Sequence, residues 1–513
     1  MALAEQMSGR PARQRGRADP APGPAAAGDS RLFWAVPIVL LALLVPLNVF
    51  AGPLVLTTQR VVLMVAIFPV AMRFISGDYG RIRFIDWAIF LYLLWATLTI
   101  GINNPAAVVQ YSGSTSLELL GGYLIGRCCI RNIHQFRRMA RLFAGLVLLS
   151  LPFALYEGIT GQSLLLRVYN GLPVVFSARE ITTAPRLGLY RAQFTMPTPI
   201  HYGLFAALAL CLVTVAHQNL WGLAKRLVVG GAIFLCSFLS LSSGAFLAVV
   251  FQIGFLAWAR MTRGITIRWW ILFAIAAVFY TVIEVFSDRS GIMVFLSYAT
   301  FSAATAFNRV LIFNYGMDNV WANPLFGIGL NDWVRPFWML HPSVDNFWLL
   351  NTMRHGLPSF LLMSVAWLGQ IWIVAKRPLT EGSDLYWARR AWLFTIVSMT
   401  FTLCTVDVWG PPFVLCFFLF GAGAWLMDAA EPEDAAAAEP VQEGPADRPG
   451  RDRTEPPSRR RQTLSRNRRD AAPEESPDDG PEQSSPEAGT TDTPVRRRAP
   501  YARPPGDRRP RRG

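Results

Sequence analysis

The stretch "LHPSVDNFWLLNTMRHGLPSFLLMSVAWLGQIWIV", residues 340–374, joins a polar cluster to a long apolar run. A helix needs about 20 mostly apolar residues to cross a bilayer, and residues 348–374 exceed that length. His341, Asp345 and Asn346 come just before the run. The sequence therefore predicts a membrane helix with hydrogen-bonding and titratable side chains at its mouth.

The composition predicts a polytopic membrane protein. Of 513 residues, 52% are hydrophobic and 16% are charged, whereas soluble proteins average about 25% charged residues. From Glu431 to Gly513, 17 arginines balance 17 acidic residues, so the net charge of +14 lies in the first 430 residues. There the positive charge forms short clusters between apolar runs. This pattern is typical of a membrane protein and not of a nucleic-acid binder.

Apolar runs predict an all-α fold with about twelve transmembrane helices. The fourth run is short, and the seventh and eighth are separated only by "SSG" near 242–244. The expected spans are 33–52, 58–75, 84–101, 113–126, 139–158, 197–216, 226–242, 243–259, 269–286, 348–374, 391–407 and 411–427.

Basic residues predict the orientation. With a cytoplasmic N-terminus, every short basic loop falls on the cytoplasmic side, as the positive-inside rule requires, and both termini are cytoplasmic. Two long loops, 159–196 and 287–347, then lie on the outer face, because long loops translocate despite their charge. Their arginines are either solvated surface or an anion site, since a guanidinium binds carboxylate or phosphate bidentately. These arginines are Arg167, Arg179, Arg186, Arg191, Arg289, Arg309 and Arg335.

Outside the membrane domain, residues 32–427, the chain is predicted to be disordered. Residues 1–31 and 428–513 are rich in Pro, Arg and other polar or small residues and cannot bury a core. No cleavable signal peptide is convincing. The six cysteines lie in or beside apolar runs without metal-ligand spacing. Cys128 and Cys129 are either a redox pair or, as we favour, small apolar residues at a helix end.

The first long loop ends in "PRLGLYRAQFTMPTPIHYG", residues 185–203. Arg186 and Arg191 lie five residues apart, and Pro197 and Pro199 open the next helix. Proline is tolerated in a first turn, where the backbone amides are unpaired. Free amides beside arginines predict a phosphate site at the membrane surface.

The second long loop contains "NRVLIFNYGMDNVWANPLFGIGLNDWVRP", residues 308–336. It predicts an amphipathic segment from Arg309 to Trp321 that is stopped by Pro324. A turn, Gly327-Ile328-Gly329, follows. It is not a nucleotide-binding loop, because it lacks a third glycine and a flanking strand–helix unit.

This second stretch, the His/Asn cluster after it and "MRHGLPSFLL" at 353–362 together resemble the core signature of the O-antigen ligase and O-antigen polymerase superfamily. Four further pieces look like the same family: "LELLGGYLIGR" at 117–127, "LYEGITGQSLL" at 155–165, "YRAQFTMPTPIHYG" at 190–203 and "LSLSSGAFLAVV" at 239–250. The resemblance covers about residues 84–375 and is strongest at 309–362.

The resemblance implies a GT-C-like glycosyltransferase of the bacterial inner membrane that uses no metal and no cofactor. Such enzymes take a glycan from an undecaprenyl-diphosphate carrier on the periplasmic face. A ligase passes it to lipid A–core, and a polymerase passes it to another lipid-linked glycan. The sequence does not choose between them.

By motif position, the catalytic residues that the resemblance implies are Arg191, Arg309 and His341. Candidate substrate-binding residues are Arg186, Asn346, Arg335, Gly327 and Gly329. Without a metal, arginines must hold the charge that grows on the leaving diphosphate. Histidine is the best-tuned base for the acceptor hydroxyl near neutral pH.

The chain departs from the family pattern at two points. The family has His directly before Asn, whereas here Asp345 precedes Asn346 and His341 stands four residues earlier. The base is therefore either His341 or Asp345, and Asp345 could instead cap the next helix. Ser243 replaces a family arginine, which removes a charge at that turn.

A transporter or flippase of lipid-linked oligosaccharides is the competing class. It should show inverted repeats and charge at the bilayer midplane; we find no internal repeat, and the charge gathers at the outer boundary. The acids within or beside the spans, Glu118, Glu157 and Glu284, are each expected to have a partner. Besides membrane lipids, cytoplasmic partners of the C-terminal tail are a further possibility.

Overall fold

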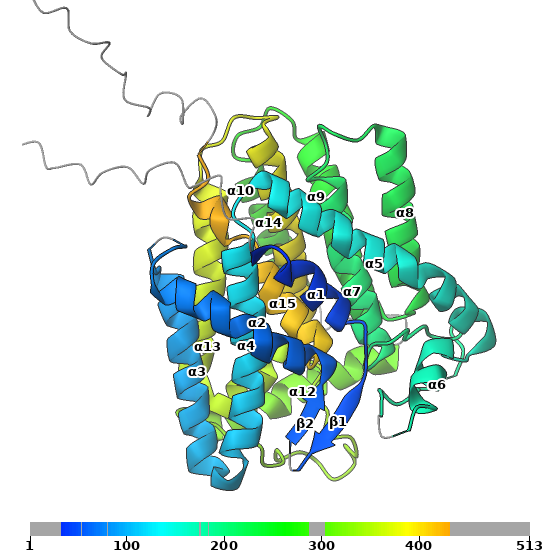
Figure 1. Ribbon diagram of the computed structural model, residues 1–513, viewed down its shortest axis with the longest axis vertical. Coiled ribbons are helices and arrows are strands. Elements are labelled where there is room, and N and C mark those ends of the chain that lie inside the picture. The colour runs from blue at the N-terminus through cyan, green and yellow to red at the C-terminus, as the bar shows by residue number, and fades with distance from the viewer. Residues whose placement is uncertain are drawn as a thin grey trace, which may run out of the picture. The chain divides into compact units, whose positions relative to one another are not determined.

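The computed structural model describes residues 32–52, 54–79, 81–173, 176–182, 184–286 and 303–430. Nearly all of the termini predicted to be disordered, and the start of the second long loop, lie outside this part. Within it the chain is mostly helical, as predicted (Figure 1).

The α-helices are α1 (Ala35–Ala42), α2 (Thr58–Ile75), α3 (Phe84–Asn103), α4 (Gly113–Cys129), α5 (Ile133–Thr160), α6 (Leu164–Asn170), α7 (Pro199–Thr214), α8 (Leu223–Leu239), α9 (Ser243–Met261), α10 (Arg268–Phe286), α12 (Ala303–Ala322), α13 (Phe347–Lys376), α14 (Asp384–Leu403) and α15 (Pro411–Gly421). Short 3-10 or π turns are η2 (Pro105–Ala107), η3 (Val108–Ser112) and η4 (Ala424–Met427).

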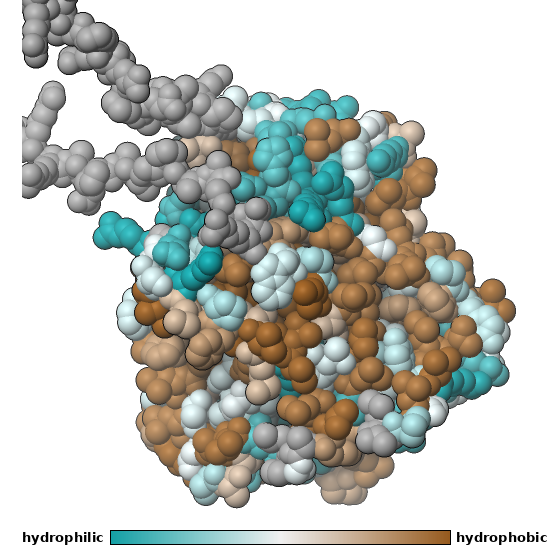
Figure 2. All heavy atoms as spheres, viewed as in Figure 1, coloured by the Kyte–Doolittle hydropathy of each residue, from teal (hydrophilic) through white to brown (hydrophobic). Residues whose placement is uncertain are grey.

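Six helices of the described part are long and apolar enough to cross a membrane: α2, α3, α5, α9, α10 and α13. The apolar segments 199–214 and 411–427 are shorter. Apolar residues also dominate the visible surface between the two ends of the helices (Figure 2). The chain therefore has the makeup of a membrane protein, and the predicted number of about twelve spans stays a prediction.

The predicted span 33–52 is wrong as a single helix. Helix α1 has only eight residues, and β1 (Asn48–Ala51) pairs with β2 (Leu54–Thr57) as an antiparallel hairpin. Pro46 stops the helix because it lacks the amide hydrogen that a helical residue donates. Asn48 also bridges to Phe176 in the first long loop. The fold is thus helical with one hairpin, not purely α.

Among the predicted boundaries that shift, two lie beside the candidate site. Helix α14 ends at Leu403, so residues 404–407 belong to the connection that precedes α15. The break between α8 and α9 falls at residues 240–242, slightly earlier than the "SSG" stretch. Leu241 adopts a φ of +44° in this break. Both changes matter for the site, because these two connections contact it.

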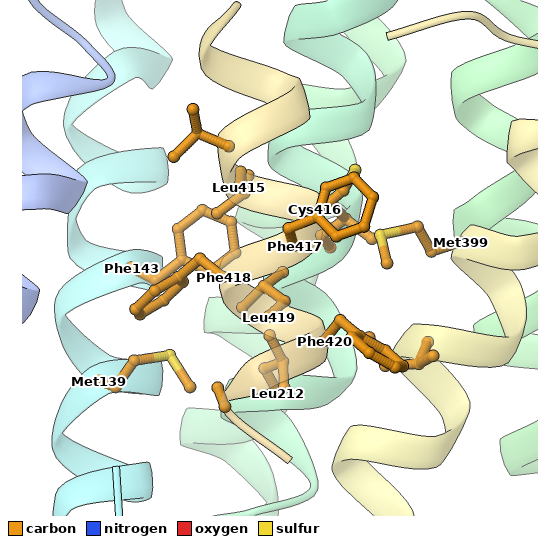
Figure 3. Close-up of a cluster of buried hydrophobic side chains, with 14 of the residues drawn as sticks. Met139, Phe143, Leu212, Met399, Leu415, Cys416, Phe417, Phe418, Leu419 and Phe420 are labelled. Atoms are coloured by element: carbon orange, nitrogen blue, oxygen red, sulfur yellow. The ribbon is translucent and has the colours of Figure 1, made fainter. Parts of the chain in front are cut away.

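Helix α15 forms the centre of the core. Side chains from α5, α7 and α14 surround its residues 415–420 (Figure 3). Helix α4 packs closely against α15 through Gly122 and Gly126, where an added Cβ would collide with backbone atoms of α15; at Gly122 it would lie 2.6 Å from the carbonyl oxygen of Val414. Small residues four apart allow two helix backbones to approach in this way.

The short basic loops gather at one end of the helices, and their cytoplasmic location stays a prediction. The contacts that join these loops are Arg83–Asp428, Arg137–Asp384, Arg268–Glu381 and Asn219–Asp384. The β1–β2 hairpin, α6 and α12 lie at the other end (Figure 1). That other end carries the candidate site.

Candidate functional site

The break in α13 organises one side of the site. Gly356 has a φ of +76°, which is not helical and which only glycine adopts readily. The break frees the carbonyl oxygens of Met353 and Arg354. They accept hydrogen bonds from the amides of Ile328 at 2.8 Å and Gly329 at 3.0 Å. The Gly-Ile-Gly turn therefore fastens the broken helix.

Gly327 occupies a position in this turn where a larger residue would not fit. An added Cβ there would lie 2.5 Å from the carbonyl carbon of Arg354. The turn positions Arg354 and His355 by backbone contact, and the candidate substrate-binding role of Gly327 and Gly329 stays a prediction. His355 is buried, and its Nδ1 lies 2.7 Å from the Thr99 hydroxyl. This contact fixes the ring in the core.

Three predicted arginines come together beside the α8–α9 break. Arg186 Nη1 donates to the carbonyl oxygen of Leu241 at 3.0 Å, and Arg191 Nε donates to that of Ser240 at 3.2 Å. The end of a helix favours cations, because its last carbonyl groups have no helical partner. Arg186 also interacts electrostatically with Arg191 and with Arg309. We call Arg186, Arg191 and Arg309 the arginine cluster.

The arginine cluster carries excess positive charge. None of its members forms an ion pair within the described residues, and Asp345 is the one acid that interacts electrostatically with Arg309. Burial, followed by the Arg186 charge, lowers the pKa of Arg191 to about 10. Burial also lowers the pKa of Arg309, which the Asp345 charge opposes. A desolvated, under-neutralised cluster is a ready site for an anion.

Arg309 lies in α12, within the helix predicted over Arg309–Trp321. Its Nε is buried and has no hydrogen-bond partner among the residues that the structure describes. Gly244, in the first turn of α9, leaves room for its guanidinium, because an added Cβ would stand 3.0 Å from Nη2. The same Cβ would lie 3.5 Å from the carbonyl oxygen of Thr405. The α14–α15 connection therefore borders the arginine cluster.

The structure separates the two candidate bases. Asp345 is half-buried near Arg309, whereas His341 is exposed and has no hydrogen bond or ion pair among the described residues. Burial raises the pKa of Asp345, and the Arg309 charge opposes the rise. The suggestion that Asp345 caps α13 is wrong. Asn346 is the cap, and its side chain accepts from the Leu349 amide at 3.0 Å.

Arg335 is not a member of the arginine cluster, and its contacts are with residues of its own loop. Its guanidinium pairs with Asp332, Nε donates to the carbonyl oxygen of Met339 at 2.9 Å, and the group lies 5.5 Å from the Trp333 ring centroid. These contacts hold the loop together. The candidate substrate-binding role of Arg335 stays a prediction.

A cavity of about 430 Å³ opens between the β1–β2 hairpin, α3, α4, α13 and the α14–α15 connection. None of the nine predicted site residues lines it. Its polar wall includes Arg60, Glu118, Arg354 and Asp407. Glu118 pairs with Arg60 at 2.8 Å, which confirms that this acid has a partner. Among the described residues no group of His, Cys, Asp or Glu side chains is suited to hold a metal.

Asp407 connects the cavity to the arginine cluster. It lines the cavity and interacts electrostatically with both Arg354 and Asp345. Burial raises the pKa of Asp407 to about 7. The sequence prediction overlooked it by including it in a span, although a single acid between two apolar runs was a usable signal.

Comparison with protein-family models and with curated proteins finds no match to this chain. The function is therefore argued from the arrangement of its own side chains.

Proposed function

We propose that the protein is a membrane glycosyltransferase that takes a glycan from an undecaprenyl-diphosphate carrier on the periplasmic face of the bacterial inner membrane. The observation that carries the proposal is the arginine cluster, whose three guanidinium groups have Asp345 as their one electrostatic acid partner in the described part of the chain. A lipid diphosphate would supply the missing negative charge. The motif resemblance supports the same class, with a GT-C-like fold of about twelve spans.

The position of the arginine cluster supports the periplasmic side. It lies at the end of the helices that is opposite the short basic loops, and such loops face the cytoplasm in membrane proteins. Both termini would then be cytoplasmic. A carrier lipid in the outer leaflet would present its diphosphate at the end of the helices that carries the arginine cluster.

The arginine cluster and Asp345 would divide the transfer reaction between them. The acceptor hydroxyl attacks the anomeric carbon of the donor sugar, a new carbon–oxygen bond forms, and the bond to the diphosphate breaks. The electron pair leaves with the diphosphate, where the arginine cluster stabilises it. The proton of the acceptor hydroxyl passes to the Asp345 carboxylate, the better placed of the two candidate bases. The acceptor is lipid A–core or a second lipid-linked glycan.

Purified protein given an undecaprenyl-diphosphate-linked glycan and an acceptor tests the proposal. Arg309→Ala should lower the transfer rate about 10²–10³-fold, the usual effect of losing one preorganised donor. Arg309→Lys should restore little, because lysine lacks the bidentate fork. Arg167→Ala is the matched control and should transfer normally, because Arg167 is an outer-loop arginine that pairs with Glu180 and belongs to no candidate site. Near-normal transfer by Arg309→Ala would contradict the proposal.

Deleting the gene and analysing the cell's glycans would separate the two acceptor classes. Loss of long chains, with single repeats still attached to lipid A–core, would indicate a polymerase. Chains that accumulate on the carrier without attachment would indicate a ligase. Unchanged glycans and unchanged lipid-linked intermediates would count against any glycosyltransferase.

A further inference from the structure

We propose that five arginines at the end of the helices where the short basic loops gather bind the head group of an anionic phospholipid, whose acyl chains lie along α10. The arginines are Arg263, Arg268, Arg377, Arg389 and Arg390, and we call them the basic-end group. This group lies at the opposite end of the helices from the arginine cluster. The proposal goes beyond the glycosyltransferase activity and does not depend on it.

The basic-end group comes from two connections and the helices that follow them. Arg263 lies in the α9–α10 connection, and Arg268 begins α10. Arg377 follows α13, while Arg389 and Arg390 lie in the first two turns of α14. Arg389 interacts electrostatically with Arg268 and Arg377. Arg390 interacts with Arg263 and Arg268. Residues far apart in the sequence therefore place like charges near one another.

The basic-end group carries excess positive charge. Within the described part of the chain, Glu381 is the one acid that forms an ion pair with any of its members. Glu381 lies 3.5 Å from Arg268 Nη2, and its side chain is 77% exposed. An ion pair this exposed to solvent is weak. Five cations and one exposed acid leave a surface that attracts an anion, and guanidinium groups bind phosphate bidentately.

Aromatic rings hold the Arg390 guanidinium in place. Its Cζ lies 5.2 Å from the ring centroid of Tyr386, 5.3 Å from that of Trp387 and 5.5 Å from that of Phe394. Nη1 also donates to the Tyr386 hydroxyl at 3.1 Å. Stacking on aromatic faces and donating from the edge is a typical arrangement for arginine. The position of this guanidinium is therefore fixed before any ligand binds.

Arg389 is fixed in a similar way. Its Cζ lies 5.4 Å from the Tyr386 centroid, and its Nη1 donates to the carbonyl oxygen of Arg377. The other side-chain nitrogens of Arg389 and Arg390 make no hydrogen bond among the described residues, and they are not fully buried. A guanidinium has five N–H donors. Most donors of this arginine pair can therefore be reached by the oxygens of a phosphate.

Helix α10 supplies the apolar part of the proposed site. Arg268 is its first residue, and none of its residues is buried within the described part of the chain. Trp269 packs edge-on against Phe394, with ring centroids 5.5 Å apart, so the start of α10 lies beside α14. Trp270 and Phe273 are 64% and 67% exposed. Tryptophan is enriched where a helix crosses the membrane–water interface.

The charge and the apolar surface together favour a lipid. A phosphate at the basic-end group would lie at the start of α10, and acyl chains would follow the exposed side chains of that helix. Basic pockets between transmembrane helices bind anionic head groups in this way. A water-soluble anion would use the arginines and leave the α10 surface without a partner.

Native mass spectrometry of the full-length protein in detergent tests the site. The probes are dioleoyl phosphatidylglycerol and dioleoyl phosphatidylcholine, which have the same acyl chains and differ in the net charge of the head group. Phosphatidylglycerol should bind about ten-fold more tightly or better, because each arginine beside an anionic lipid contributes about five-fold. Equal affinity for the two lipids would overturn the proposal. Glycerol 3-phosphate at the same concentration should not displace phosphatidylglycerol, and displacement would show a site for soluble phosphate instead.

The double variant Arg389→Ala, Arg390→Ala assigns the binding to this site. It should weaken phosphatidylglycerol binding about 10–30-fold and leave phosphatidylcholine binding unchanged. The matched control is Arg138→Ala combined with Arg141→Ala, which removes the same charge from α5 at the same end of the helices. Arg138 also lies over an aromatic ring, 4.8 Å from the Phe33 centroid. Equal losses in the two double variants would show a general attraction to the basic loops and would overturn the assigned site.

Arg263→Glu keeps the test decisive if the double variant does not fold. Arg263 is exposed, so reversal of its charge should spare the fold and weaken phosphatidylglycerol binding about 10–30-fold. Arg138→Glu, also at an exposed position, is its control. Unchanged phosphatidylglycerol binding by Arg263→Glu would refute the site. None of these measurements involves glycan transfer, so the lipid site and the role of Arg309 stand or fall separately.

Discussion

Gly244 lies directly against the guanidinium of Arg309: a Cβ at this glycine would stand 3.0 Å from Arg309 Nη2 and 2.9 Å from Val406 Cγ2. The first turn of α9 thus sets where the arginine can lie. The position of the Arg309 side chain, on which the proposed chemistry most depends, is therefore set partly by Gly244.

Gly244→Ala should displace the Arg309 guanidinium and slow transfer by about 10-fold to 10²-fold, because a misplacement of about 1 Å can cost as much. The transfer assay measures the rate, and thermal unfolding measures the fold. Gly254→Ala, in the same helix, is the control, since a Cβ there meets no atom of the described residues within 4 Å. Equal rates for the two variants would contradict the expected displacement.

Gly356→Ala should destabilise the fold. Alanine disfavours the φ of +76°, and its Cβ would collide with the carbonyl oxygen of Leu325. The strain and the overpacking together should cost about 3 kcal/mol. Gly231→Ala in α8, where a Cβ meets no atom of the described part of the chain within 4 Å, should instead be neutral or slightly stabilising. Thermal unfolding in detergent compares them, and an unchanged midpoint for Gly356→Ala would contradict the assigned strain.

The sequence predicted those parts of the fold that depend on local patterns. A long apolar run needs little context to be a helix, so α13 was predicted within a few residues of its observed ends. The stop at Pro324 and the turn after it were also predicted, because proline and glycine act on their own backbone. The hairpin of residues 48–57 was missed, since a short apolar run fits a strand or a helix equally well.

The site was predicted less completely. Arg186, Arg191, Arg309 and Asp345 lie in motifs that mark them individually, and the structure brings them together. The walls of the cavity could not be found in this way. Arg60, Glu118, Asn351 and Asp407 are about 350 residues apart at the extremes, and only tertiary packing makes them neighbours. The sequence around each of these four residues gives no sign that the other three lie nearby in the fold.

Asp407 should make the stability of the protein depend on pH. Burial raises its pKa to about 7, whereas an unfolded chain has an ordinary pKa near 4. Between these values the folded state binds a proton that the unfolded state releases, so the free energy of unfolding falls as the pH rises. Asp407→Asn removes the ionisable carboxyl group and with it this decrease in the free energy of unfolding. Its unfolding temperature should exceed that of the wild type at pH 8 and match it more closely at pH 5.

The expected gain at pH 8 exceeds about 1.4 kcal/mol, the equivalent of one pKa unit. Asp332→Asn is the control, because Asp332 is exposed and Arg335 lowers its pKa. This variant should lose a little stability at pH 8 and gain none. A gain for Asp407→Asn that is the same at both pH values would show that its charge is not the cause.

Asp345 and His341 can be separated by their effects on rate and on pH dependence. Asp345 is half-buried and interacts electrostatically with Arg309, so Asp345→Asn should lower the transfer rate about 10²–10⁴-fold, the usual contribution of a general base. His341 is exposed and has no partner in the described part of the chain, so His341→Ala should transfer near the wild-type rate. Since Asp345 must be ionised to accept a proton and burial raises its pKa, the wild-type rate should fall on acidification, starting above the range of an ordinary aspartate. The residual rate of Asp345→Asn should lack this acid limb, and an acid limb that disappears in His341→Ala instead would assign the base to His341.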